Sequence, residues 1–554
     1  MSAPAPMRVV DVELAAAPAY DLDAALSDAA GEHAHDLVRA LVRLHGMPLG
    51  ALELPARDVA QPDGLTRAVA ARLGHALLRH LLADLLAGPR PLAPWPLTAN
   101  ALAAAAHPRF AGPWPLVTVA VCTRERPRDL ARCLDALERL DYPALELLVV
   151  DNAPVTDATR RVVEARGARV RYACEPRPGL SHARNLAIAT ARGTLLAFTD
   201  DDVVADAGWL RGAVPLFAAQ PDVQAVTGLV VPLELETEAQ RLFERYRGFG
   251  HGYERRWYRG RPGRVAAEHG NTGKFGAGAN MIFRRDVFAR IGGFDPTLGA
   301  GTATAGGDDL EMFFRVLAEG HTLAYEPAAM VRHAHRRTHA ELREQITGWG
   351  SGRAAYVRRA RAAYPRERLG FARREAWWLA TWIGARLARS LVAHGGPSRE
   401  LILAELRGSL RGSLRGGVPS GASPGLHAAP ATPATPRRAS GADAPRSRSM
   451  AEYRVDLEEP LAPLDGAERH ARVRVAVMLG GRRVGDVRIA NESAPVGATR
   501  LADAIVAGLG DRLLAGALDG TPVELAHAVT ARLRGGAAPD AARAQAAAAW
   551  GAHV

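Results

Sequence analysis

Three consecutive aspartates, residues 200–202, directly follow an apolar run over residues 194–199. The run predicts a buried strand, which places the three carboxylates at its carboxyl end, where open α/β sheets bind ligands. Clustered carboxylates repel one another, and a divalent cation with a diphosphate behind it offsets that repulsion. Such oxygen ligands suit Mg²⁺ or Mn²⁺. The alternative is an N-cap for a helix over residues 206–210, for which one aspartate would suffice.

A second acidic pair, Asp308 and Asp309, follows two glycines and opens a segment with helical spacing over residues 310–317. A helix N-terminus stabilises an ionised carboxylate, which suits such a group to accept a proton at neutral pH. Helix capping alone is the simpler alternative.

The elements that must position these residues follow from the spacing of the apolar runs. Short runs at residues 116–121 and 145–150 end in polar residues, and a segment with helical spacing follows each of them. Alternating short strands and helices are typical of right-handed βαβ units, which form a parallel sheet. The polar residues at the strand ends should therefore meet at one edge of that sheet.

In this order the motifs resemble those of family 2 glycosyltransferases, over about residues 113–345. These enzymes use nucleotide sugars, invert the anomeric centre and have a Rossmann-like A-type glycosyltransferase fold. The resemblance therefore implies an α/β domain with a mostly parallel sheet. It rests on eight segments in the family's order: 121–127, 149–152, Gly179 with 183–185, 198–202, 276–281, 291–295, 307–310 and 331–335.

The resemblance implies substrate contacts at the strand ends. Thr123 and Asp151 would hold the nucleotide, with Asp151 accepting a hydrogen bond from the base. Arg184 would brace the nucleotide or the diphosphate, since a guanidinium offers a rigid fork to phosphate oxygens. Arg124 and Asn280 are further substrate-binding residues by the same resemblance. The alternatives are a turn-initiating role for Asp151 and a solvated charge for Arg184.

The acidic residues carry the chemistry that the resemblance implies. By this resemblance Asp200 and Asp202 would form the D-x-D pair and bind the metal, Asp202 more directly, while Asp200 would also contact the substrate and Asp201 would orient its neighbours. Asp309 would be the general base that deprotonates the acceptor hydroxyl. Asp308 is one methylene shorter than the glutamate usual in the family, which weakens the case for a supporting catalytic role.

Two histidines follow an apolar run over residues 325–331, and strand alternation places His333 and His335 on one face. Related enzymes often have a histidine that binds metal or diphosphate after this strand, and we expect one of the two, His333 in preference to His335, to be a metal ligand here. Further basic residues crowd the stretch, so a basic patch that faces phosphate is the alternative. They are Arg332, Arg336, Arg337 and His339.

These features predict a metal-dependent inverting glycosyltransferase, with Mg²⁺ or Mn²⁺ as cofactor and a nucleoside-diphosphate sugar as donor. The acceptor would be a glycan, a lipid-linked molecule or a small molecule, in polysaccharide or cell-surface glycan synthesis. The alternatives are a catalytically inactive relative that serves as a binding or scaffold protein, and a nucleic-acid binder. Only the net charge of +11 suggests the latter. Because an acidic sheet edge disfavours phosphate-backbone binding, we expect no nucleic-acid partner.

Cysteine usage and the first residues bear on location. Cys122, Cys133 and Cys174 lack paired metal spacing, which indicates free thiols in a reducing compartment. The N-terminus lacks the basic and apolar regions of a signal peptide. We therefore expect a cytoplasmic protein. A basic, Trp-bearing helix over residues 376–385 suggests a peripheral location at the inner face of the membrane, and packing on the catalytic domain is its alternative.

The two ends of the chain resemble each other. Residues 39–54 align without a gap on residues 474–489, each preceded by a strand-like piece and followed by a helical pattern. We expect each copy to form a strand, a hairpin that turns at Gly46 or Gly481, and a helix. So small a unit buries little core alone, and we expect the copies to pair within the chain or in a dimer.

The resulting plan places small α+β repeat modules on both sides of the catalytic domain. The modules are residues 1–95 and 450–535, and the catalytic domain is residues 113–345. The remaining parts are a linker at 96–112, a helical extension at 346–410, a disordered linker at 411–449 rich in Gly, Ser, Pro, Ala and Arg, and a tail at 536–554.

Overall fold

The computed structural model describes most of the chain, in two compact units. The first unit comprises residues 1–112, 218–222 and 441–554, and the second comprises residues 113–217 and 223–440. The described residues are 6–15, 37–59, 61, 63–88, 92, 97–108, 110–261, 263–392, 398–414, 447–515 and 521–534. Most of the expected linker at 411–449 and all of the expected tail lie outside these residues.

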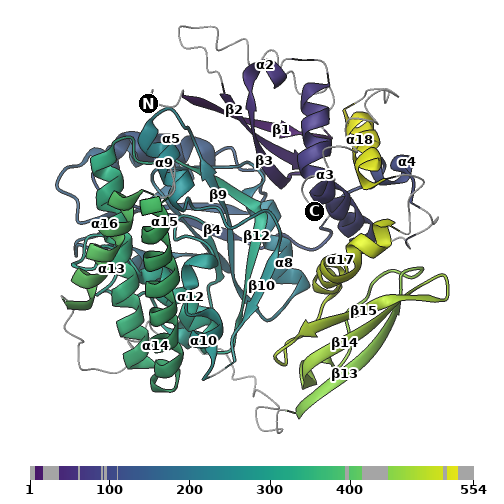
Figure 1. The fold of residues 1–554 in the computed structure, drawn as a ribbon. Coiled ribbons are helices and arrows are strands. Elements are labelled where there is room, and N and C mark those ends of the chain that lie inside the picture. The colour runs from purple at the N-terminus through teal and green to yellow at the C-terminus, as the bar shows by residue number, and fades with distance from the viewer. Residues whose placement is uncertain are drawn as a thin grey trace. The chain divides into compact units, whose positions relative to one another are not determined.

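The second unit is built around one large mixed sheet (Figure 1). Within the described residues the strand order is β10-β12-β9-β11-β7-β4-β5-β6, and β8 pairs with β12. The pairs β4–β5, β4–β7, β5–β6 and β9–β12 are parallel, whereas β8, β10 and β11 pair antiparallel with their neighbours. The strands are β4 (Val117–Thr123), β5 (Leu145–Asn152), β6 (Val170–Glu175), β7 (Leu195–Asp200), β8 (Val203–Ala205), β9 (Val223–Pro232), β10 (Arg256–Arg259), β11 (Met281–Arg284) and β12 (Thr322–His333). The expected mostly parallel α/β sheet is confirmed.

Helices cover both faces of this sheet, which explains why its central strands read as continuous apolar runs. Along β4, Val119 and Val121 join one apolar cluster with α5 (Pro127–Leu137) and α8 (Trp209–Ala219). Ala120 points the other way, into a cluster with α7 (Leu180–Thr190) and α12 (Asp308–Ala318). The other helices of this unit are α6 (Ala158–Glu164), α9 (Glu238–Tyr246), α10 (Val265–His269), α11 (Val287–Ile291), α13 (His339–Ala363), α14 (Arg368–Trp377), α15 (Arg386–Val392) and α16 (Arg399–Leu414).

The strand register brings the polar strand ends together. Thr123 at the end of β4 lies opposite Asp151 on β5, and Cys122 lies opposite Asp200 on β7. Parallel neighbours end at the same edge, so the residues that follow these strands converge on one side of the sheet.

The helical extension belongs to the second unit, and its Trp378, Ile383 and Leu401 share an apolar cluster with Phe243 of α9. It differs slightly from the expected bounds, because α13 begins at His339 and α16 continues to Leu414. The guanidinium carbon of Arg353 lies 3.6 Å from the Trp378 ring centroid, and Trp382 Nε1 donates a 2.8 Å hydrogen bond to Glu405. Trp377 is 52% exposed. Across the described part of the chain, the helices are all too short or too polar to cross a membrane.

The first unit contains two small sheets of the same design. In each, the first strand pairs parallel with the second, and the second pairs antiparallel with the third. One has β1 (Met7–Glu13), β2 (Leu37–Leu44) and β3 (Met47–Pro55), followed by α2 (Ala56–Val59), α3 (Gly64–Ala87) and α4 (Ala99–Ala103). The other has β13 (Ser447–Asp456), β14 (His470–Leu479) and β15 (Arg482–Ala490), followed by α17 (Ala498–Ala515) and α18 (Pro522–Leu533). Helix α4 lies inside the stretch that the sequence predicted to be a linker.

Both ends of the chain contribute to one apolar cluster of this unit, which includes Leu77 and Leu81 of α3 with Leu509 of α17 and Val529 of α18. Helix α3 contacts both α17 and α18. That the modules are copies of one repeat, and that they pair in solution, stays a prediction.

Deleting residues 450–554 should expose apolar surface on the N-terminal module, because half of this cluster would be lost. We expect a lower melting temperature for that module and stronger binding of an apolar fluorescent dye, with the second unit unaffected. Unchanged melting of the N-terminal module would contradict the pairing.

A single methyl group offers a finer test of the same contact. A Cβ at Gly74 of α3 would lie 2.7 Å from the Cβ of Ala526 on α18, whereas a Cβ at the aligned Gly510 would meet only ordinary contacts of 3.6 Å or more. Both substitutions by alanine gain the same helix propensity, about 1 kcal/mol. We therefore expect Gly74→Ala to melt at a lower temperature than Gly510→Ala, and the reverse order would argue against this packing.

Candidate active site

A cavity of about 780 Å³ lies at the carboxyl edge of the sheet in the second unit. The three aspartates after β7, the two at the start of α12 and His333 at the end of β12 all line it. Thr123, Arg124 and Arg184 also contribute to its wall. The fold thus brings together most of the residues that the sequence singled out.

Asp201 is held in place by two neighbours. Thr123 Oγ1 donates a 2.7 Å hydrogen bond to its Oδ2, and Arg126 Nη1 lies 2.6 Å from its Oδ1. Burial raises the pKa of Asp201 to about 6, although Arg126 and Thr123 act in the opposite direction. The Thr123 hydroxyl, expected on the nucleotide, is therefore engaged with the acidic cluster.

Asp202 lies between basic groups and the buried His333. Its Oδ2 accepts from Arg126 Nη1 at 3.1 Å, and its Oδ1 lies 3.3 Å from His333 Nε2. Burial raises the pKa of Asp202, but His333, Arg126 and Arg336 outweigh it, so the pKa lies below its usual value. Asp202 is consequently ionised at neutral pH.

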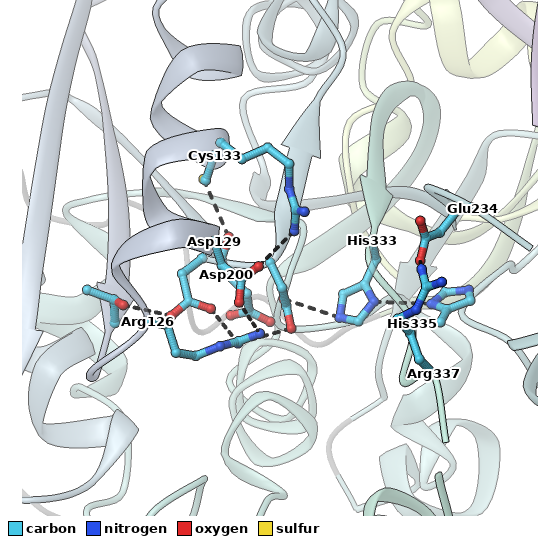
Figure 2. Close-up of polar contacts among 12 residues, drawn as sticks. Arg126, Asp129, Cys133, Asp200, Glu234, His333, His335 and Arg337 are labelled. Carbon is cyan, nitrogen blue, oxygen red and sulfur yellow. Dashed lines mark hydrogen bonds and ion pairs between the residues drawn. The ribbon is translucent and has the colours of Figure 1, made fainter. Parts of the chain in front are cut away.

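His333 faces the aspartates and His335 lies behind it, as Figure 2 shows. The two Nδ1 atoms are 3.1 Å apart, and His335 Nε2 lies 3.0 Å from Glu244 Oε1. Burial lowers the pKa of His333 to about 4, so its imidazole is neutral near pH 7. A neutral ring nitrogen that points at a carboxylate can also serve as a metal ligand.

Asp200 is the most open of the three aspartates. Its side chain is 35% exposed, and its Oδ1 lies 3.7 Å from Arg184 Nη2. Burial of the surrounding site raises its pKa to about 7, which Arg184 partly offsets. An added cation would favour its ionised form.

Arg184 is buried and bonded to protein groups. Its Nη1 donates to Asp308 Oδ2, its Nη2 donates to the Gly278 carbonyl at 3.3 Å, and its guanidinium carbon lies 5.3 Å from the Phe294 ring centroid. Burial lowers the pKa of Arg184, but Asp308 and Asp200 more than compensate. This geometry excludes the solvated charge that was its alternative, and it gives Asp308 a partner.

Asp309 lines the cavity next to Asp308, in the first turn of α12. Its Oδ2 accepts a 2.9 Å hydrogen bond from the Gly278 N–H, and its Oδ1 accepts from the Leu310 N–H at 2.8 Å. Burial and the neighbouring Asp308 raise the pKa of Asp309 despite these bonds. The sequence suggested that the helix N-terminus would keep the pKa of Asp309 low. Burial and Asp308 outweigh that effect, and the raised pKa makes the carboxylate a stronger base.

Asp151 lies beneath the cavity wall, and Asn152 is the neighbour that lines the cavity. Tyr172 donates a 2.9 Å hydrogen bond to Asp151 Oδ2. Asp151 Oδ1 and the nearby Thr159 hydroxyl are buried without a hydrogen bond of normal geometry among the described residues. Burial raises the pKa of Asp151, and Oδ1 retains the capacity to accept a hydrogen bond.

Asn280 requires a correction, because its side chain is fully buried and used internally. Its Oδ1 accepts from Trp209 Nε1 at 2.8 Å, and its Nδ2 donates to the carbonyls of Leu229 and Ala329. These bonds use both amide hydrogens and tie the residue before β11 to neighbouring elements, so the fully buried side chain is not presented to a substrate. Arg124, by contrast, is exposed on the cavity wall.

Sequence reasoning missed the role of Arg126, which bonds two of the three aspartates. It opens α5 and lies in a segment that carried the family resemblance, but only the fold shows its direction. The preceding Glu125 has a left-handed backbone (φ 53°), and its carboxylate accepts hydrogen bonds from the Val155 and Thr156 N–H groups. This residue ties the loop after β4 to the loop after β5.

The comparisons with known proteins agree on the second unit. Residues 113–352 match the family model described as glycosyltransferase like family 2. The glucosyl-dolichyl phosphate glucuronosyltransferase of Haloferax volcanii is 26% identical over 213 residues, which cover 38% of this chain and 65% of that protein. The pre-mycofactocin glycosyltransferase of Mycobacterium tuberculosis is 28% identical over 178 residues, 32% of this chain and 33% of that protein.

Among solved structures, a mannosyltransferase from Pyrobaculum calidifontis in complex with GDP-Man and Mn²⁺ is similar to this chain. It is 19% identical, the match covers 63% of this chain and 97% of that one, and the TM-score is 0.38. The sheet and helices of the second unit have the A-type glycosyltransferase-like α/β fold.

Proposed function

We propose that the glycosyltransferase family 2-like domain of this chain, over residues 113–352, transfers a sugar from a nucleoside-diphosphate sugar to an acceptor hydroxyl. One observation carries the proposal: an acidic cluster with a neutral histidine and a separate carboxylate of raised pKa line the same cavity. The first group suits a cation and the diphosphate behind it. The second suits proton removal.

Asp202, Asp200 and His333 would hold Mg²⁺ or Mn²⁺. The donor set fits, because Asp202 is ionised, Asp200 is the most open carboxylate and His333 is neutral. When bound, the cation offsets the negative charge of the departing nucleoside diphosphate. Arg126, which also bonds Asp201, would fix the direction of the Asp202 carboxylate.

Asp309 would take the proton from the acceptor hydroxyl. It lines the cavity, and burial beside Asp308 raises its pKa, which favours proton transfer to it. Asp308 is bonded to Arg184 and would hold that guanidinium near the diphosphate site. Displacement by the deprotonated hydroxyl in one step inverts the anomeric carbon, and no enzyme nucleophile is required.

The nucleotide end of the donor would lie over β4 and β5. Asp151 Oδ1 is a buried acceptor with no well-formed hydrogen bond among the described residues, and a base N–H would satisfy it after a small opening of the wall. Arg124 is exposed beside this position and would contact the donor phosphates.

The proposal also covers the class of acceptor and the cellular location. We infer a glycan, lipid-linked or small-molecule acceptor, in polysaccharide or cell-surface glycan synthesis, and a cytoplasmic enzyme. The exposed Trp377, with Leu379 at 49% exposure beside it, offers an apolar surface next to the cavity that suits the inner face of a membrane.

Nucleoside diphosphate release from UDP-, GDP- and dTDP-sugars, measured with Mg²⁺ and with Mn²⁺, tests the function. We expect one nucleotide class to give release that an acceptor extract stimulates, and the Asp309→Asn variant to show none of that stimulation. Saturable donor binding without any release would favour the catalytically inactive binding or scaffold protein. Neither binding nor release with any donor would contradict the proposal.

A further inference from the structure

The first unit contains a cluster of three histidines and one aspartate, far along the chain from the acidic cavity. His45 lies at the turn between β2 and β3, His80 and Asp84 stand one helical turn apart on α3, and His107 follows α4. One ligand atom of each side chain lies within 4.8 Å of the others. No described residue of the second unit takes part.

All three imidazoles point at the Asp84 carboxylate. His45 Nδ1 and His107 Nδ1 lie 2.8 Å from its Oδ2 and Oδ1, and His80 Nε2 lies 3.2 Å from Oδ2. In a tetrahedral Zn²⁺ site with bonds of about 2.0–2.1 Å, ligand atoms are separated by about 3.3 Å. The three His–Asp84 distances of 2.8–3.2 Å approach that value, and all four ligand atoms lie within 4.8 Å of one another.

His80 supplies an independent indication of a missing ligand. Its side chain is only 9% exposed, and its Nε2 is buried without a hydrogen bond of normal geometry among the described residues. Asp84 is also buried, and its two carboxylate oxygens lie within 3.2 Å of the three imidazoles. A buried ring nitrogen directed at a carboxylate oxygen is a suitable ligand for a cation between them.

The backbone of the turn at His45 is held in place by Glu13, which fixes the position from which the imidazole projects. His45 has φ 55°, and the Glu13 carboxylate accepts hydrogen bonds from the His45 N–H at 2.9 Å and the Gly46 N–H at 3.0 Å. Non-glycine residues rarely adopt this left-handed backbone. At the aligned position of the other hairpin stands Gly480, with φ 57°, so the turn itself does not require histidine.

The other module lacks the rest of the cluster as well. When Gly74 is aligned with Gly510, the positions of His80 and Asp84 correspond to Gly516 and Gly520. The aligned sequence therefore repeats neither side chain, and the pair is particular to the N-terminal module.

We propose that His45, His80, His107 and Asp84 bind Zn²⁺ as a closed, four-ligand structural site. Imidazole nitrogens favour Zn²⁺ over Mg²⁺, and four protein ligands leave no open position for catalysis. The metal joins the hairpin turn, helix α3 and the segment after α4, and so cross-links a module that has little core of its own. This site is separate from the proposed catalytic cation.

Cobalt titration of the full-length protein, stripped with chelator and dialysed, tests the site. Tetrahedral Co²⁺ absorbs strongly in visible light, whereas octahedral Co²⁺ absorbs weakly. We expect about one equivalent to give the tetrahedral band, Zn²⁺ to displace it, and Zn²⁺ to raise the melting temperature by several degrees.

Matched variants separate the outcomes. His107→Ala and His80→Ala should both lose the band and the Zn²⁺ stabilisation. The His107 side chain is 46% exposed, so folding should not depend on it. His75→Ala, on the same helix and 49% exposed, should keep both. Asp202→Ala should also keep them. Absence of the band in the wild type, its persistence in His107→Ala, or its loss in Asp202→Ala would overturn the proposal.

Discussion

Replacing Asp202 with alanine is expected to abolish sugar transfer without unfolding the second unit. The change removes the carboxylate that His333 and Arg126 flank, and with it the most strongly ionised ligand of the proposed cation. Without the cation, the charge that develops on the departing diphosphate loses its main compensation, which the nearby arginines alone do not replace. Transfer is measured as nucleoside diphosphate release, and folding by circular dichroism and the melting temperature.

Two controls complete this test. Asp157→Ala removes an aspartate that pairs with Arg161 on the exposed surface of the same unit, and it should leave transfer unchanged. Excess chelator should stop the wild type, and Mg²⁺ or Mn²⁺ alone, without Zn²⁺, should restore it. Full activity in excess chelator would refute the metal dependence.

The second large effect is expected from Asp309→Asn. The amide is nearly isosteric but cannot accept a proton, so turnover should fall by at least about a hundredfold, the usual order for loss of a general base. Donor affinity should be retained, because Asp309 is not among the proposed metal or nucleotide ligands. Turnover and donor binding are measured separately, by product release and by calorimetry.

Asp308→Asn is the matched neighbour for this test. It removes the closer of the two charged partners of the buried Arg184, so we expect a lower melting temperature together with a moderate loss of transfer. If Asp308→Asn lost turnover at an unchanged melting temperature while Asp309→Asn ran normally, the base would be one residue away from our assignment.

The sequence predicted the catalytic fold well because its signals are local. Residues buried on both faces of a parallel strand must be apolar, and polar residues must follow where each strand ends. The runs ending at Thr123, Asp151 and Asp200 therefore indicated the sheet and its ligand-binding edge before any coordinates. The acidic pair at the start of α12 was visible for the same reason, since helix starts have their own pattern.

Contacts between segments far apart in the chain could not be predicted from the sequence. Arg184 and Asp308 are 124 residues apart in the chain, and nothing local to either residue indicates their pairing. Asn280 was expected to bind substrate because it lies in one of the segments that resemble the family's motifs. Its three internal hydrogen bonds depend on strands and a helix that only the fold brings around it.

By itself the sequence determined the order of strands and helices, the acidic sheet edge and the resemblance between the two termini. Each of these depends on patterns within short segments of the chain. The tertiary structure decided which side chains meet: His333 rather than His335 against Asp202, Arg126 on the aspartates, and His45 beside Asp84. The physical reason is that burial and long-range packing fix side-chain directions, and a linear pattern records neither.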